Sequence, residues 1–237
     1  MGNSLVIARR ELGSVFARPL AYVFAAVFLA LGGWLFTRHF VPGEEASLHL
    51  LFMDLVTALV VVIPILTMPL ISEELSRGTI ETMMTAPVTE TQMVLGKFLG
   101  VFIFYLFLLA MTLLYMVLVA IYGQPEPGQA LMGYAGMVLV GAMFISVGLF
   151  FSSLTRDQLL AALLSAAVLV ALTLGAEELI RRAGGVWRTL IGQVSVSGQF
   201  KSFSRGILDT RALAFFLSTT VFFLFTTVKV LESRRWR

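Results

Sequence analysis

Gly96-Lys97 is the only Gly-Lys pair in the chain, and it is therefore the first candidate for phosphate chemistry. A phosphate-binding loop follows the pattern G-x-x-x-x-G-K-[ST], in which backbone amides and the lysine bind the phosphates of a nucleotide. Thr91 stands where the first glycine of that pattern should be, and Phe98 stands where a serine or threonine should follow. We therefore expect that this chain does not hydrolyse ATP itself.

Other residue types that support catalysis or metal binding are scarce. The chain has no cysteine and only two histidines, His39 and His49, so thiolate sites and histidine clusters are excluded. It also has no H-E-x-x-H motif, which is the pattern of a zinc hydrolase. The sequence thus predicts no catalytic residue, no metal site and no cofactor bound to this chain.

The amino-acid composition indicates which class of protein the chain belongs to. Of the 237 residues, 58% are hydrophobic and 13% are charged, whereas soluble domains have about 25% charged residues. So few charges cannot coat a water-soluble protein of this size, and the surplus apolar surface has to face lipid. A soluble enzyme and a nucleic-acid-binding protein are nearly excluded, and no nucleic acid partner is expected.

Apolar runs long enough to cross about 30 Å of hydrocarbon predict six transmembrane helices. Within one transmembrane domain, residues 1–237, they cover residues 20–37, 52–71, 98–122, 131–154, 159–176 and 212–228. Six spans place both termini on one side. With both termini inside, the inner segments hold ten Lys and Arg residues and the outer ones hold one, if residues 177–211 are left out. The positive-inside rule thus predicts cytoplasmic termini, although six further cations in residues 177–211 conflict with it.

Prolines and small residues mark places where spans bend or approach each other. Pro64 and Pro69 weaken the backbone ladder of the second span, which suits a hinge, with a static kink as the alternative. Two small-x-x-x-small pairs, Gly96 with Gly100 and Ala162 with Ala166, allow close helix contact. For both pairs we favour packing within the chain over a seam between two copies.

Two segments outside the spans have amphipathic patterns. Residues 5–17 have apolar side chains at helical spacing around Arg9, Arg10 and Glu11, which predicts a helix in the cytoplasmic interface that ends before Pro19. An ordinary basic anchor ahead of a span is the alternative. Residues 177–211 combine apolar helical spacing with arginines, which predicts helices on or in the outer leaflet. A solvated loop is the alternative there.

The segment from Glu73 to Gly100 predicts a short amphipathic helix held between two turns. Gly78 permits a turn before this helix, and Pro87 stops it. Thr89 and Gln92 then form a capping box, so a new helix starts there and runs into the third span. Because both ends are fixed to spans, such an element can transmit force, although any inner loop can also carry an interfacial helix. One face holds Ile80, Met83 and Met84, and the other holds Glu81, Thr82 and Thr85.

The same segment resembles the permease subunits of ABC-2 type transporters. The matching elements, in order and spacing, are Glu73-Glu74, Gly78-Thr79, Glu81, Pro87 and Gly96-Lys97. The opening at residues 8–24 and the tail at residues 200–237 resemble gliding-motility-associated ABC permeases. The nitrous-oxide-reductase maturation permease is a more distant relative.

The resemblance implies a multi-pass protein of the bacterial inner membrane that works as a homodimer or related heterodimer. Each copy would dock on a cytoplasmic ABC ATPase subunit, which binds Mg-ATP. Residues 5–17 would be a connecting helix, and residues 177–211 would be extracytoplasmic, which resolves the charge conflict. The ATPase-coupling helix would be formed by Gly78, Thr79, Ile80, Glu81, Thr82, Met83, Met84, Thr85, Ala86 and Pro87.

The function predicted is therefore that of a permease subunit, not an enzyme, which couples ATP hydrolysis on another chain to export or conformational work. Its partners would be the ATPase, a second permease copy, membrane lipid and an extracytoplasmic protein. A membrane scaffold or assembly factor is the alternative, and so is a secondary transporter. Asp54 is the only candidate charge inside a span, and this scarcity disfavours ion coupling. The apolar, Phe-rich spans weakly favour an amphipathic cargo.

Overall fold

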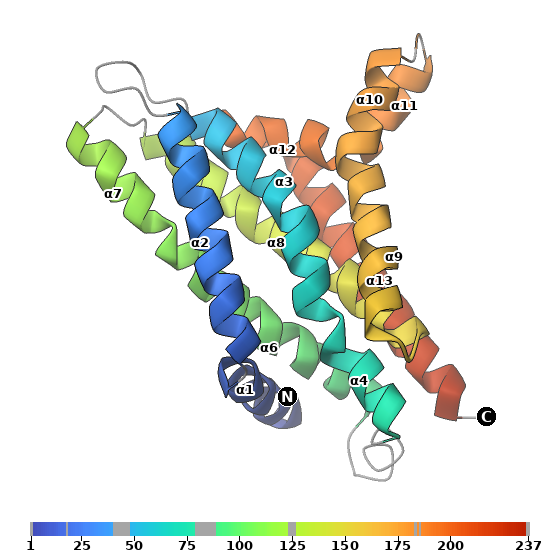
Figure 1. Ribbon diagram of the computed structural model, residues 1–237. Helices are drawn as coiled ribbons and strands as arrows, with labels where there is room; N and C mark the ends of the chain where they lie inside the picture. The colour runs from blue at the N-terminus through green and yellow to red at the C-terminus, as the bar shows by residue number, and fades with distance from the viewer. Residues whose placement is uncertain are drawn as a thin grey trace.

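Helices make up nearly all of the chain that the computed structural model describes, which is residues 2–17, 19–39, 48–78, 89–122, 127–182, 184 and 186–235. Within these ranges no strand occurs, which confirms the predicted all-α fold class. The helices in chain order are α1 (Gly2–Ala17), α2 (Pro19–His39), α3 (Leu48–Thr67), α4 (Pro69–Arg77), α6 (Glu90–Met111), α7 (Leu113–Tyr122), α8 (Pro127–Leu154), α9 (Gln158–Val170), the π-helix η1 (Ala171–Gly175), α10 (Ala176–Arg182), α11 (Val186–Val194), α12 (Val196–Ser204) and α13 (Thr210–Arg235) (Figure 1).

Six helical stretches in the described residues are long and apolar enough to cross a membrane, as the sequence predicts. Because the count is even, the chain enters and leaves the bundle at one end, and α1 and the end of α13 do lie at the same end in Figure 1. The stretches are Ala21–Arg38, His49–Arg77, Glu90–Leu118, Pro127–Leu154, Gln158–Arg182 and Thr210–Arg234.

The second and third spans each consist of two helices, whereas the sequence predicted a hinge or kink at Pro64 and Pro69 in the second span and no break in the third. In the second span α3 continues through Pro64 and ends before Pro69, where α4 begins. In the third span α6 and α7 meet at Thr112, whose hydroxyl donates to the Leu109 carbonyl at 2.6 Å. Apolar residues continue across both interruptions, so the hydropathy of residues 98–122 gives no sign of the second.

The central helix of the bundle is α8, which contacts α3, α4, α6, α9, α12 and α13. Glycines let its neighbours approach closely. A Cβ atom on Gly133 would lie 2.2 Å from the Phe52 ring, and one on Gly141 would lie 2.1 Å from the Tyr105 ring. The α8 stretch is 67% buried, whereas the first and last spans are 17% and 22% buried. Those two helices therefore supply much of the apolar surface that has to face lipid.

The helix predicted over residues 5–17 is present as α1, and it packs across the first turns of α6. The Phe16 ring lies edge-on to the Phe104 ring, with 5.2 Å between the ring centroids. After α1, Pro19 is the first residue of α2, where its missing N–H removes no hydrogen bond.

The contact between α1 and α6 depends on a glycine. A Cβ atom on Gly100 would lie 2.8 Å from the Cβ atom of Glu11 and 3.2 Å from the Ala8 carbonyl oxygen. Gly96 is buried one turn earlier on α6. Close packing at Gly100 thus occurs within the chain, as expected for this pair, and it brings Glu11 up against α6.

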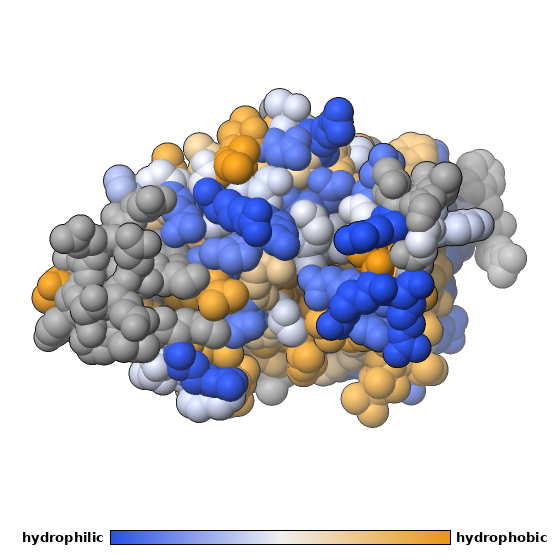
Figure 2. Space-filling view, turned by 90° about the horizontal axis from the view of Figure 1, so that it is seen from above, coloured by the Kyte–Doolittle hydropathy of each residue, from blue (hydrophilic) through white to orange (hydrophobic). Residues whose placement is uncertain are grey.

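The helices predicted over residues 177–211 are present as α10, which ends the fifth stretch, and as α11 and α12 after it. They lie at the opposite end of the bundle from α1 (Figure 1). Of these helices, α12 packs on α8 and α3 and buries Phe200 and Phe203, so it is part of the bundle. Trp187 of α11, in contrast, is 69% exposed. The placement of this region on or in the outer leaflet stays a prediction. Figure 2 looks onto this end and shows hydrophilic side chains over much of the face and hydrophobic ones around its rim.

Candidate functional site at the junction of α1, α4 and α6

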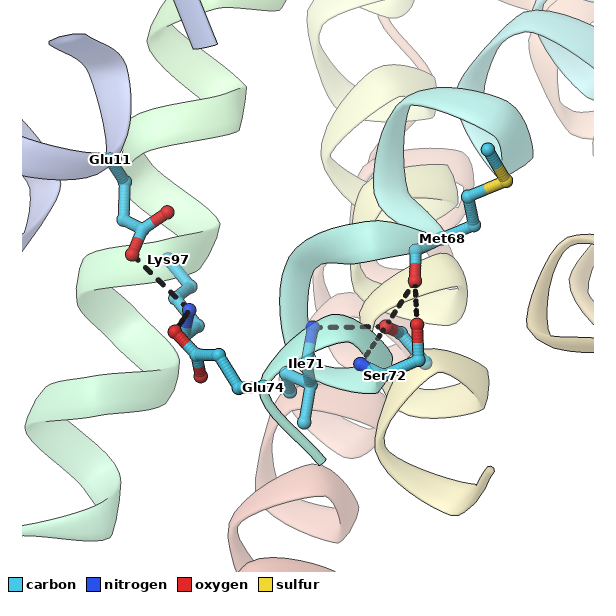
Figure 3. A network of polar contacts seen from close by, with 7 residues as sticks. Glu11, Met68, Ile71, Ser72, Glu74 and Lys97 are labelled. Atoms are coloured by element: carbon cyan, nitrogen blue, oxygen red, sulfur yellow. Dashed lines mark hydrogen bonds and ion pairs between the residues drawn. The ribbon is translucent and has the colours of Figure 1, made fainter. Parts of the chain in front are cut away.

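A buried lysine joins three helices at the end of the bundle that holds α1. The Nζ atom of Lys97, on α6, lies 2.6 Å from Oε1 of Glu74 on α4 and 3.2 Å from Oε1 of Glu11 on α1. Figure 3 shows both carboxylates converging on the ammonium group from opposite sides. The Lys97 side chain is only 2% exposed, so the three charges form a desolvated triad.

The energetics of the triad depend on all three members. An ammonium group taken out of water loses several kcal/mol of hydration, and nearby carboxylates have to offset this loss. Glu74 and Glu11 are themselves only 16% and 13% exposed, so the Coulomb attraction is weakly screened. The burial of Lys97 therefore depends on Glu11 of α1 and Glu74 of α4, and each carboxylate depends on Lys97.

The neighbouring Glu73 has a different role, although the sequence pairs it with Glu74. Glu73 forms an ion pair at 2.7 Å with Arg77, one turn later on α4, and the Arg77 side chain is 70% exposed. The Glu73 side chain is 17% exposed, about as little as Glu74, but its partner Arg77 lies in solvent and not in a buried site. An i,i+4 pair with an exposed cation contributes only a few tenths of a kcal/mol. Of the Glu73-Glu74 pair, Glu74 is therefore the member that holds α4 against α6.

This difference leads to a testable prediction. Replacing Glu74 by Gln is expected to lower the free energy of unfolding by about 2 kcal/mol, because the amide oxygen can still accept from Lys97 but the negative charge beside the buried ammonium group is lost. The matched Glu73→Gln variant, next to it in sequence, should lose less than about 0.5 kcal/mol. Denaturant titrations of both variants in the same detergent would test this. Equal losses would show that Glu74 contributes nothing specific.

The turns on either side of residues 79–88 are fixed by local hydrogen bonds. At the end of α4, Gly78 has φ of +70°, which favours glycine, and its N–H donates to the Glu74 carbonyl. Thr89 begins α6 with the predicted capping box, in which Thr89 and Gln92 each accept the other's backbone N–H at 3.3 Å. Residues 79–88 themselves lie outside the described part of the chain, and with them the predicted coupling residues from Thr79 to Pro87.

Specific hydrogen bonds also stabilise the interruption of the second span. The Ser152 hydroxyl, on α8, accepts the N–H groups of Ile71 and Ser72 at 3.1 Å each and donates to the Met68 carbonyl at 2.8 Å. Ser72 donates its own hydroxyl to the same carbonyl. These groups appear beside the triad in Figure 3. Of the two predicted hinge prolines, Pro69 lies at the break, and Pro64 lies inside α3.

The structure brings together only part of the residue set singled out from the sequence. Glu74 and Lys97 meet, Gly96 is buried next to Lys97, and Glu73 points to Arg77. The sequence did not identify Glu11 as a partner, because it was only one of three charged residues between the apolar positions of residues 5–17. The one signal for it was Gly100, which allows α1 to approach. Among the described residues no cluster suited to a metal ion occurs.

Comparison with known proteins identifies the family. The profile of the ABC-2 family transporter protein matches residues 43–181, which is more than half of the chain. The chain is 33% identical over 127 residues to "Probable multidrug ABC transporter permease YbhS" of Escherichia coli, in strain K12 and in O157:H7. That similarity covers 53% of this chain and 33% of those relatives, so the chain spans about a third of their length. The chain belongs to the ABC-2 family of transporter permeases.

Proposed function

We propose that this chain is the transmembrane subunit of an ABC exporter whose ATPase is a separate cytoplasmic polypeptide that binds Mg-ATP. Family membership and the six candidate spans support this proposal. So does the position of Lys97, which is buried between two carboxylates and cannot serve as a phosphate-binding lysine. The observation that carries the proposal is the triad, because it links the helices on both sides of residues 79–87.

The expected path of force follows from the two turns and the triad. Residues 79–88 connect Gly78, at the end of α4, to Thr89, at the start of α6. A force applied to this segment is therefore transmitted to both helices. Lys97 and Glu74 tie these two helices to each other, and Glu11 ties α1 to them. The part of α1 around Glu11, the beginning of α6 and the end of α4 would therefore move together when the ATPase closes on ATP.

The finer parts of the proposal concern assembly and cargo. We expect one transmembrane domain in the bacterial inner membrane, with both termini cytoplasmic and two permease copies per complex. The resemblance of residues 8–24 and 200–237 to gliding-motility-associated permeases supports placement in that branch. The cargo would be amphipathic, or the complex would instead exert force on an extracytoplasmic partner at the α10–α12 end. The YbhS name describes multidrug transport for that relative.

Co-purification tests the proposal directly. The full chain, expressed with the ABC ATPase encoded beside it, is expected to form a stable complex in detergent. A Lys97→Met/Glu74→Gln/Glu11→Gln variant without the triad charges tests whether the triad supports docking, and it should retain less ATPase. If the wild-type chain binds no ATPase, the scaffold interpretation replaces the permease one.

A further prediction concerns the coupling segment itself. Replacing Glu81 or Thr82 by Ala is expected to reduce the stimulation of ATP hydrolysis in the complex about fivefold, which is the lower end of typical coupling free energies. The melting temperature should not change, because these residues lie outside the spans. A Glu178→Ala variant, altered on α10 at the opposite end, is the control and should keep wild-type stimulation. Full stimulation in both coupling variants would place the docking helix elsewhere.

A further inference from the structure

The last turns of α8 contact the second span on both sides of its interruption. On the α3 side, a Cβ atom on Gly148 would lie 2.0 Å from the Thr67 hydroxyl, so this glycine allows α3 to end directly against α8. On the α4 side, Ser152 bonds to Met68, Ile71 and Ser72. Gly148 and Ser152 are four residues apart and so share one face of α8. One face of one helix thus supports both halves of the second span.

The hydroxyl of Ser152 uses its full hydrogen-bonding capacity at this place. A serine hydroxyl has one donor and two acceptor sites, and Ser152 donates to Met68 and accepts from Ile71 and Ser72. Pro69, as the first residue of α4, has no N–H to continue the ladder of α3. The start of α4 is therefore held by a side chain of another helix as well as by its own backbone.

The end of α8 is itself fixed to the last span. Arg234, near the end of α13, donates to the carbonyl oxygens of Ser153 and Leu154 at 3.0 and 2.9 Å. These carbonyls belong to the last turn of α8, where a cation also interacts favourably with the helix dipole. The turn that carries Ser152 is thus anchored on α13, while α4 is anchored at its other end by Glu74.

We propose that the last turn of α8 is the pivot on which α4 moves relative to α3, and that Ser152 is the positioning residue of this pivot. Its use in transport rests on the proposed function, because the ATPase would push on the far end of α4. The pivot itself is a property of this chain alone. The backbone ladder of α3 continues to the Met68 N–H, which donates to the Pro64 carbonyl at 2.9 Å, and Pro69 supplies no donor after it. Ser152 would guide α4 by holding the amides of Ile71 and Ser72 directly after this gap.

Hydrogen–deuterium exchange on the full chain in lipid nanodiscs, without ATPase, tests the pivot separately from the proposed function. In Ser152→Ala, the amides of residues 70–77 are expected to exchange on the order of tenfold faster, the factor that corresponds to about one lost hydrogen bond. The control is Ser153→Ala. Ser153 is equally buried in the same turn, but its hydroxyl donates at 2.6 Å to Phe150 within α8.

The outcomes separate a positioning role from a general packing role. Faster exchange confined to residues 70–77 in Ser152→Ala, with wild-type exchange there in Ser153→Ala, supports the pivot. Equal exchange in the two variants would overturn it, and so would faster exchange spread evenly over α8, because the hydroxyl would then stabilise the whole bundle. A failed co-purification with the ATPase would contradict the proposed function and leave this result untouched.

Discussion

Replacing Lys97 with methionine is expected to lower the free energy of unfolding by about 3–5 kcal/mol, which is the usual loss when one member of a buried ion pair is removed. Methionine keeps much of the length and apolar volume of the lysine stem, so packing changes little. What remains is two carboxylates, on Glu74 and Glu11, without the ammonium group that both contact. We expect the connections of α1 and α4 to α6 through this site to be lost. Denaturant titration in detergent, followed by tryptophan fluorescence, measures the loss.

Lys229→Met provides the matched control for this prediction. Lys229 forms an ion pair at 2.7 Å with Glu232, three residues later on α13, and its side chain is 54% exposed. Solvent screens such a pair, so the control should lose less than about 1 kcal/mol. If both variants lost the same amount, the burial of Lys97 would have no energetic consequence and the triad would not hold the three helices together.

A triple variant distinguishes lost charge balance from lost packing. Combining Lys97→Met with Glu74→Gln and Glu11→Gln removes all three charges while keeping side chains of similar size. Replacing a whole buried ionic group by neutral residues is often nearly neutral for stability. The triple variant should therefore recover at least half of the loss seen for Lys97→Met alone. If the triple variant were no more stable than Lys97→Met, the lysine would stabilise the fold through the packing of its side chain and not through its charge.

The positions of the spans were predictable because length and apolarity alone decide whether a helix can cross a membrane. Interruptions of those spans were not. Pro69 marks a break and Pro64 does not, although both lie in one apolar run. The difference comes from α8, which supplies Ser152 to the amides after Pro69. Such a partner lies about 80 residues away in the chain, beyond the reach of any local pattern.

The candidate site shows the same limit more sharply. When cations are counted on each side of the membrane, Lys97 is treated as an anchor at the membrane surface. In the fold, α1 covers Lys97 and makes it a buried cation. The helical pattern of residues 5–17 places Glu11 among the charged positions, and its partner Lys97 is 86 residues away in the chain. Only the family resemblance grouped Glu74 with Lys97 in advance. The coupling residues between Thr79 and Pro87 stay a prediction, because they lie outside the described residues.

Replacing Phe200 with alanine is expected to lower the free energy of unfolding by about 3–5 kcal/mol, the usual range for a large aromatic side chain removed from a core. Phe200 is fully buried in α12. A Cβ atom on Gly136 of α8 would lie 2.9 Å from its ring, so the ring sits directly on the backbone of the central helix. The same titration in detergent that serves for Lys97 measures the loss.

The result decides whether α12 is packed into the core of the bundle or lies on the membrane surface. If α12 lay on a leaflet, as its amphipathic sequence suggests, Phe200 would face lipid or detergent, and its removal would cost the fold little. Trp187→Ala on the neighbouring α11 is the control, because that larger side chain is 69% exposed and its loss should change stability by less than about 0.5 kcal/mol. If Phe200→Ala lowered the free energy of unfolding as little as this control, α12 would have to be placed on the leaflet. The expected large loss instead makes α12 part of the bundle core, through which a movement of α8 would reach the opposite end of the protein.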